Sequence, residues 1–187
     1  MIYVLTCICY RYPMSLRIPP SLLARKIVCP AYFPKPFPED ARLRFLGMHA
    51  MTALRVIRRH LGLGYQLREI EKRGNGCRAD LVFQDASGRL RVCEVKSAKV
   101  LTRLHHIQTA LYSNRDYDEV VLSNRETDIQ LTRDYIESIL RQAQTTRELL
   151  INHAQEAAST FRPGEDICRS CANQRCSFLP TETRTDH

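Results

Sequence analysis

Two short segments with strand-forming sequences, 78–84 and 89–97, are separated only by the turn-forming residues Asp-Ala-Ser-Gly. A connection this short joins antiparallel neighbours, because parallel strands need a crossover of about a dozen residues or more. The middle of the chain is therefore expected to form a β-hairpin, and the segments on either side of it must supply the elements that pack around it.

Charged residues interrupt both strands of this hairpin. Asp80 lies near the start of the first strand, and Glu94 and Lys96 lie two residues apart on the second, a spacing that places them on one face. If the loop covers five residues, Asp80 is directly opposite Glu94, whereas a loop of four breaks that alignment. Two carboxylates within about 5 Å repel each other unless a cation lies between them, and oxygen ligands favour Mg²⁺ or Mn²⁺. The pattern predicts either a surface ion pair or a metal site beside an amine that assists hydrolysis.

The remaining segments predict a single α/β domain. Apolar residues at helical spacing predict helices at 40–62, 101–114 and 133–159, the last capped by Thr132 or Asp134. Further strands are expected at 65–73, 117–124 and 127–132. We divide the chain into an N-terminal extension (1–28), a core (29–160) and a cysteine-rich segment with its tail (161–187).

The net charge of +8 suits a polyanionic partner. The apolar run at the start of the chain is too short to span a bilayer and lacks a positively charged flank, so we expect a cytoplasmic protein with no membrane anchor. Either Met1 or Met14 fits as the start of translation.

The chain contains eight cysteines, which in a reducing compartment favour metal ligation over disulfides. Three of them follow the last predicted helix with the spacing C-x2-C-x4-C, namely Cys168, Cys171 and Cys176. They can converge on one soft metal centre, which needs a fourth ligand. Cys29 fits this role, with Cys7 and Cys9 as competing candidates. Cys77 and Cys93 are expected to be small buried core residues.

The charged residues of the hairpin resemble the PD-(D/E)xK nuclease signature, although the proline before the acid is missing; the matching positions are Asp80, Glu94, Val95 and Lys96. Gln108 and Tyr112, four residues apart on one predicted helix, resemble the QxxxY motif of the RecB-like branch. His49 lies on the first predicted helix, where that branch carries a metal-binding histidine. Singly, His49 is also explained as a partly buried histidine and the Gln-Tyr pair as a solvated helix face, but their joint order indicates a nuclease.

Together with the cysteine pattern, the chain is similar to the CRISPR-associated exonucleases known as the fourth Cas protein and to related helicase-nucleases. The resemblance implies a RecB-like core with a mixed β-sheet flanked by helices, and a cluster that joins the N- and C-terminal segments. That cluster is implied to be [4Fe-4S], with [2Fe-2S] or zinc as alternatives, held by Cys29, Cys168, Cys171 and Cys176.

The resemblance also implies roles for the hairpin residues. A Mn²⁺ or Mg²⁺ ion would be bound by His49, Asp80, Glu94 and the carbonyl of Val95; Lys96 would assist the attacking water, and Gln108 and Tyr112 would steady the site. The implied activity is exonucleolytic hydrolysis of single-stranded DNA ends, used to trim prespacers for a Cas integrase. A viral or repair nuclease shares these motifs, and a non-cleaving subunit that binds DNA ends or an integrase is a further alternative.

Five basic residues can either contact phosphates or be ordinary solvated residues: Arg55, Arg58, Arg59, Lys99 and Arg103.

Overall fold

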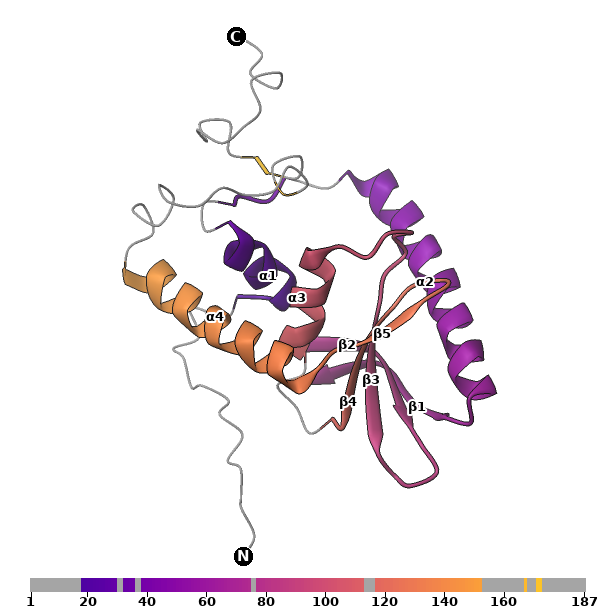
Figure 1. The fold of residues 1–187 in the computed structure, drawn as a ribbon. Coiled ribbons are helices and arrows are strands. Elements are labelled where there is room, and N and C mark those ends of the chain that lie inside the picture. Colours follow the sequence, from indigo (N-terminus) through magenta and orange to yellow (C-terminus); the bar gives the residue numbers. More distant parts are fainter. Residues whose placement is uncertain are drawn as a thin grey trace, which may run out of the picture.

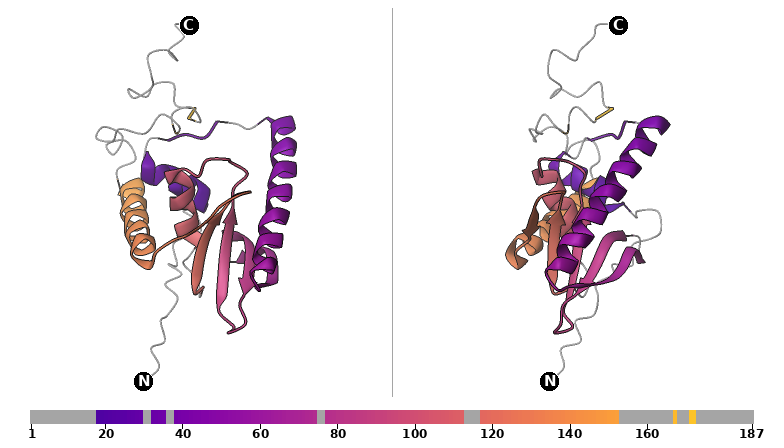
Figure 2. Two further views of the ribbon diagram at one scale, coloured as in Figure 1. Left: turned by 45° about the vertical axis from the view of Figure 1, so that its right-hand side comes forward. Right: turned by 90° about the vertical axis from the view of Figure 1, so that its right-hand side faces the viewer.

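The structure is a computed structural model that describes residues 18–29, 32–35, 38–74, 77–112, 117–152, 167 and 171–172. Within these residues, one five-stranded sheet is flanked by four helices (Figures 1 and 2). The predicted α/β class, with a mixed sheet between helices, is confirmed. None of the helices in the described residues has the length and apolar character of a membrane span.

The sheet has the strand order β1-β2-β3-β4-β5. Its strands are β1 (Gln66–Gly74), β2 (Cys77–Gln84), β3 (Leu90–Val95), β4 (Glu119–Ser123) and β5 (Asp128–Gln130). Strands β3 and β4 are parallel and are joined by a crossover through a helix, whereas the other neighbouring pairs are antiparallel. The predicted hairpin is β2 and β3, and its loop covers the five residues 85–89, because Gln84 pairs with Leu90.

The helices lie on both faces of the sheet. Helices α1 (Pro20–Val28), α3 (Arg103–Tyr112) and α4 (Arg133–Asn152) pack together on one face, and the long helix α2 (Glu39–Gly62) lies along the other (Figure 2). The start of α4 is capped by Thr132, whose Oγ1 accepts a hydrogen bond from the backbone N–H of Tyr135 at 3.3 Å. Thr132 is thus the cap, rather than Asp134. The predicted continuation of this helix over 153–159 lies outside the described residues.

Helix α1 was not predicted from the sequence, which placed residues 1–28 in an extension before the core. Its side chains Leu23, Ala24 and Ile27 are buried in the main hydrophobic core. Pro19 and Pro20 read as breakers, but proline is tolerated at the first helical position because its missing N–H would have no partner within the helix. Helix α1 therefore belongs to the core, and it brings new side chains beside the hairpin.

Two apolar clusters fill the spaces on either side of the sheet. The larger lies against α1, α3 and α4 and includes Val82, Val92 and Ile107. The smaller lies against α2 and is formed by Val56, Leu81, Phe83, Cys93, Val95 and Val121. On β3, Val92 enters the larger cluster while Cys93 and Val95 enter the smaller one, so Glu94, between the last two, faces the side of α1, α3 and α4.

Candidate active site

The candidate site forms where the ladder between β2 and β3 ends. The last pair of this ladder is Leu81 with Cys93, so its register would next oppose Asp80 and Glu94. At this point the backbone N–H of Val95 donates a hydrogen bond to Oδ2 of Asp80 at 2.8 Å. The carboxylate of Asp80 therefore takes the place of a backbone acceptor, which fixes it beside β3.

Glu94 is the most buried acid of the site, with 5% of its side chain exposed. Its Oε1 accepts hydrogen bonds from Nζ of Lys96 at 2.7 Å and from Nε2 of Gln108 at 3.1 Å, and Lys96 also donates to Oε1 of Gln108 at 2.9 Å. Its Oε2 is buried and has no hydrogen-bond partner. Burial is the main cause that raises the pKa of Glu94 to about 7; Lys96 opposes the rise and nearby Asp80 adds to it.

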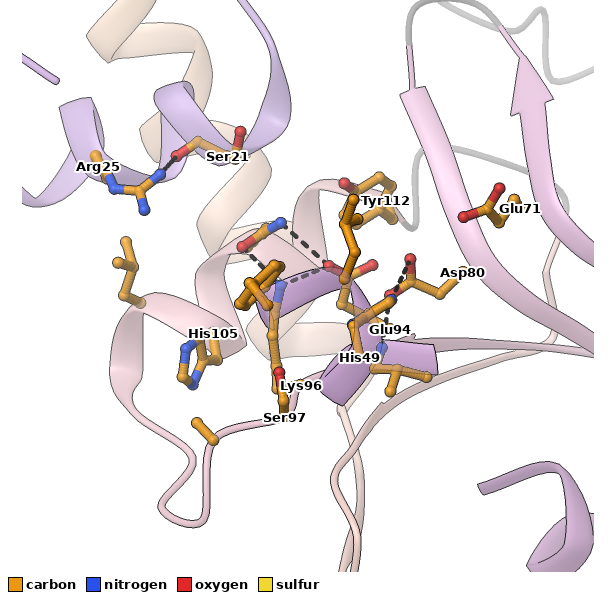
Figure 3. A pocket seen from close by; sticks show the side chains of 16 residues that line it. Ser21, Arg25, His49, Glu71, Asp80, Glu94, Lys96, Ser97, His105 and Tyr112 are labelled. Carbon is orange, nitrogen blue, oxygen red and sulfur yellow. Dashed lines mark hydrogen bonds and ion pairs between the residues drawn. The ribbon is translucent and has the colours of Figure 1, made fainter. Parts of the chain in front are cut away.

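His49 reaches the same place from the middle of α2. Its Nε2 lies 3.5 Å from Oδ1 of Asp80, and the hydrogen bond to Asp80 is the main cause that raises the pKa of His49. The other ring nitrogen, Nδ1, is buried without a hydrogen-bond partner. His49, Asp80 and Glu94 thus line one pocket, together with Val95, Lys96, Gln108 and Tyr112 (Figure 3).

The chemical types of these side chains, two carboxylates and an imidazole, are ones that can bind a hard divalent cation. In the described part of the chain no group of three or more His, Cys, Asp or Glu side chains is already arranged as a metal cage. Oδ2 of Asp80 and Oε1 of Glu94 instead accept hydrogen bonds from protein donors. Oε2 of Glu94 nevertheless remains buried and unpaired beside a second carboxylate, which is the environment that a cation would relieve.

Helix α3 supplies the two residues of the predicted QxxxY pattern. The amide of Gln108 donates to Glu94 and accepts from Lys96, so it holds the acid and the amine in one triangle. Tyr112, one turn later, lines the same pocket. The resemblance to the nuclease motifs implied this convergence, and the structure brings all seven hairpin and helix residues to one pocket.

Several residues of the pocket were not predicted. Ser21 and Arg25 come from α1, and His105 from the start of α3. His105 precedes Gln108 by three residues on one helix, a spacing that would have placed it on the same face. Phe45 precedes His49 by one turn of α2, and the two rings stack with centroids 6.1 Å apart. No sequence signal pointed to Ser21 or Arg25, because α1 itself was not predicted.

The predicted basic residues have different surroundings. Arg55, Arg58, Lys99 and Arg103 are exposed and do not line the pocket, so each remains available to a phosphate or to solvent. Arg59 was expected to contact a phosphate or to be solvated, and the structure corrects this expectation because its guanidinium is bonded within the protein. Its Nε donates to Oδ2 of Asp128 at 2.7 Å, and its guanidinium also donates to the backbone carbonyls of 124 and 125. Arg59 therefore ties α2 to the turn between β4 and β5.

The cysteine-rich region is described in part. The backbone N–H of Ala172 donates to the carbonyl of Phe33 at 2.7 Å, and that of Phe33 donates to Sγ of Cys171 at 3.3 Å. Cys171 packs against the small cluster that contains the buried Cys29. The chain after α4 thus meets the chain after α1, as a cluster that joins the N- and C-terminal segments would require. The other candidates for ligands, Cys7, Cys9, Cys168 and Cys176, lie outside the described residues, so a complete four-cysteine site is not shown.

Cys93 has the buried position that was predicted for it. Burial raises the pKa of its thiol to about 12, so the sulfur stays protonated at neutral pH. Its Sγ lies 3.6 Å from Nε2 of His60, inside the cluster against α2. Cys93 is therefore a core residue; the side chain of Cys77 lies outside the described part.

In comparisons with known proteins, no family model, no curated protein and no solved structure matches the chain.

Proposed function

We propose that the protein is a nuclease that depends on Mn²⁺ or Mg²⁺ and hydrolyses phosphodiester bonds at single-stranded DNA ends. The observation that carries the proposal is the arrangement around Glu94. This buried acid lies next to Asp80 and shares Oε1 with Lys96 and Gln108, while its Oε2 has no partner. A surface ion pair needs neither the second acid nor the burial, so the arrangement favours chemistry over a simple charge pair.

The donors for the ion would be His49, Asp80, Glu94 and the carbonyl of Val95. When bound, the ion would supply Lewis-acid stabilisation of the charge that develops on the phosphate. Lys96 is held 2.7 Å from Glu94, where its ammonium can donate a hydrogen bond to the attacking water or to a phosphate oxygen. Gln108 orients Lys96, so the amine enters the reaction without having to be reoriented.

The test is digestion of end-labelled single-stranded DNA with Mn²⁺. We expect the wild type to shorten the strand and EDTA to stop it, and Glu94→Ala or Lys96→Ala to lower the rate by about 100-fold or more. Circular dichroism and thermal unfolding check that both variants fold. Arg141→Ala is the matched control, because Arg141 is an exposed residue of α4. Normal cleavage by the Glu94 and Lys96 variants would refute the assignment.

For the cysteine-rich region, we infer an iron–sulfur cluster held by Cys29, Cys168, Cys171 and Cys176, with zinc as the alternative. The supporting observation is the meeting of the segments around Cys29 and Cys171. We expect anaerobically prepared protein to be brown and to contain iron and sulfide, and Cys171→Ser to lose the colour. Cys7→Ser and Cys9→Ser should keep the brown colour. If one of these two variants loses the colour, that cysteine is the fourth ligand instead of Cys29. Colourless protein with stoichiometric zinc would decide for zinc.

The pathway proposed is CRISPR adaptation, in which DNA ends are trimmed before a Cas integrase inserts them. A non-cleaving subunit that binds a DNA end or an integrase is the second candidate, because the meeting of the two cysteine segments fits a binding protein as well as an enzyme. The two differ in one measurement, because a binding subunit retains DNA ends in Mn²⁺ without shortening them. A viral or repair nuclease would shorten them without a partner integrase.

A further inference from the structure

The pocket has a second wall that the proposed chemistry does not use. Asp80 and Glu94 lie on one side of its 470 Å³, while Ser21, Arg25 and His105 line the other (Figure 3). The two walls differ in chemistry, since the first offers carboxylate oxygens and the second offers hydrogen-bond donors. A volume of this size is within the range of about 300 to 1,000 Å³ that ligand sites occupy.

Arg25 is held in place by contacts that leave part of its guanidinium unused. Its Nη1 donates to the backbone carbonyl of Ser21 at 3.2 Å, and its Cζ lies 5.6 Å from the ring centroid of Tyr32. Its Nε is buried and has no hydrogen-bond partner. A buried guanidinium N–H without an acceptor is costly, and a planar fork of donors matches the oxygens of a phosphate.

His105 presents a donor next to Arg25. Its Nδ1 accepts a hydrogen bond from the backbone N–H of Thr102 at 3.1 Å, so in the neutral ring the proton is on Nε2. Burial lowers the pKa of His105 to about 4, and the positive charges of Lys96 and Arg25 contribute. The ring is therefore neutral at pH 7 and donates from Nε2 without adding a charge of its own.

We propose that Arg25, supported by His105 and Ser21, binds a phosphate of the substrate strand that neighbours the phosphate being cut. This inference rests on the proposed nuclease function and extends it to a second contact along the strand. A DNA strand carries one phosphate per nucleotide, so a strand with one phosphate at Asp80 and Glu94 must place the next in or beside the same pocket. The donor wall is where an anion can be accepted, because the opposite wall would repel it unless a cation intervenes.

The experiment replaces one phosphate at a time by an uncharged methylphosphonate in a short single strand. Binding is measured in Ca²⁺ by fluorescence anisotropy and cleavage in Mn²⁺, for the wild type, Arg25→Gln and the control Arg141→Gln. We expect one replacement beside the cut to weaken wild-type binding by about 10- to 100-fold. Arg25→Gln should lose a similar factor on unmodified DNA and show no further loss at that position, because the two changes remove one contact.

Arg25→Lys separates the contact from folding. It keeps the charge and loses the fork, so we expect it to unfold at the wild-type temperature and to show an intermediate loss of DNA affinity. If Arg25→Gln remains as sensitive as the wild type at every replaced phosphate, or binds unmodified DNA normally, the inference is overturned. Failure of the nuclease proposal looks different, since the wild type would then bind DNA in Ca²⁺ with the same dependence on Arg25 but leave it uncut in Mn²⁺.

Discussion

The two faces of the sheet are covered in very different ways. On one face α1, α3 and α4 bury the larger apolar cluster, and this face also fixes Glu94, Lys96 and Gln108. The other face is covered by α2 alone over a smaller cluster, and many apolar side chains of α2 remain exposed, such as Leu43 at 65% and Met51 at 55%. The acid and the amine of the site are therefore held by the well-packed side, whereas His49 comes from the helix with fewer supports.

The largest expected effect is on the well-packed face. Ile107 is fully buried in the cluster against α1 and α4, so Ile107→Ala should lower the free energy of unfolding by about 2–5 kcal/mol, measured by urea denaturation. Met51→Ala on the exposed side of α2 is the control and should change it by less than about 1 kcal/mol. Equal losses in both variants would contradict the contrast between the faces.

The next effect concerns Glu94 and pH. Its pKa in the folded protein is raised from 4.5 to about 7, so the folded state binds more protons than the unfolded state between these values. The free energy of unfolding of metal-free protein should therefore fall as pH rises through this window, by on the order of 2–3 kcal/mol. Glu94→Gln should remove the fall, and Mn²⁺ should offset it in the wild type. A flat profile for the wild type would show that Glu94 is ionised throughout.

A smaller effect is expected when the ligand from α2 is removed. His49→Ala should weaken Mn²⁺ binding by about 10- to 100-fold, measured by calorimetry, because one of the proposed donors is lost while Asp80 and Glu94 remain in place. Cleavage should return when Mn²⁺ is raised by the same factor. Lys96→Ala, by contrast, should stay inactive at every Mn²⁺ concentration; recovery there would place Lys96 among the residues that only aid metal binding.

The smallest effect tests how α2 is attached. Arg59→Ala removes the hydrogen bonds to Asp128 and to the turn before β5, and should cost about 1–3 kcal/mol. Hydrogen exchange should accelerate along α2 more than along α3, because the helix loses a tie that the other face does not share. Arg58→Ala is the control, since Arg58 is exposed on the same helix. Uniform acceleration in all helices would mean that α2 opens only when the whole domain unfolds.

Local rules predicted the hairpin well. The sequence left the length of the loop open between four and five residues, and the structure has five, from Asp85 to Arg89, which is the length that sets Asp80 toward Glu94. Helical spacing likewise brought Gln108 and Tyr112 to one face. These successes share one property, because each depends on residues close together in the sequence.

The failures depend on distant partners. Arg59 looked like a surface residue of a basic helix, and nothing near it in the sequence indicates that Asp128, 69 residues later, accepts its hydrogen bond. Helix α1 is short and begins with prolines, so its propensity is weak and its stability comes from packing on α3 and α4. Arg25 was missed for the same reason, since a residue cannot be assigned to a pocket before its helix is known to lie there.

The side chain of Asp80 finishes the ladder between β2 and β3, which has a practical meaning for anyone who mutates this site. A carboxylate that also serves as a strand's last acceptor cannot swing aside without loosening the two strands it joins. The hydrogen bond that orients the carboxylate of Asp80 in the site is therefore the same one that joins β2 to β3. Asparagine keeps an oxygen for the amide of Val95 and sheds only the negative charge, whereas alanine removes both.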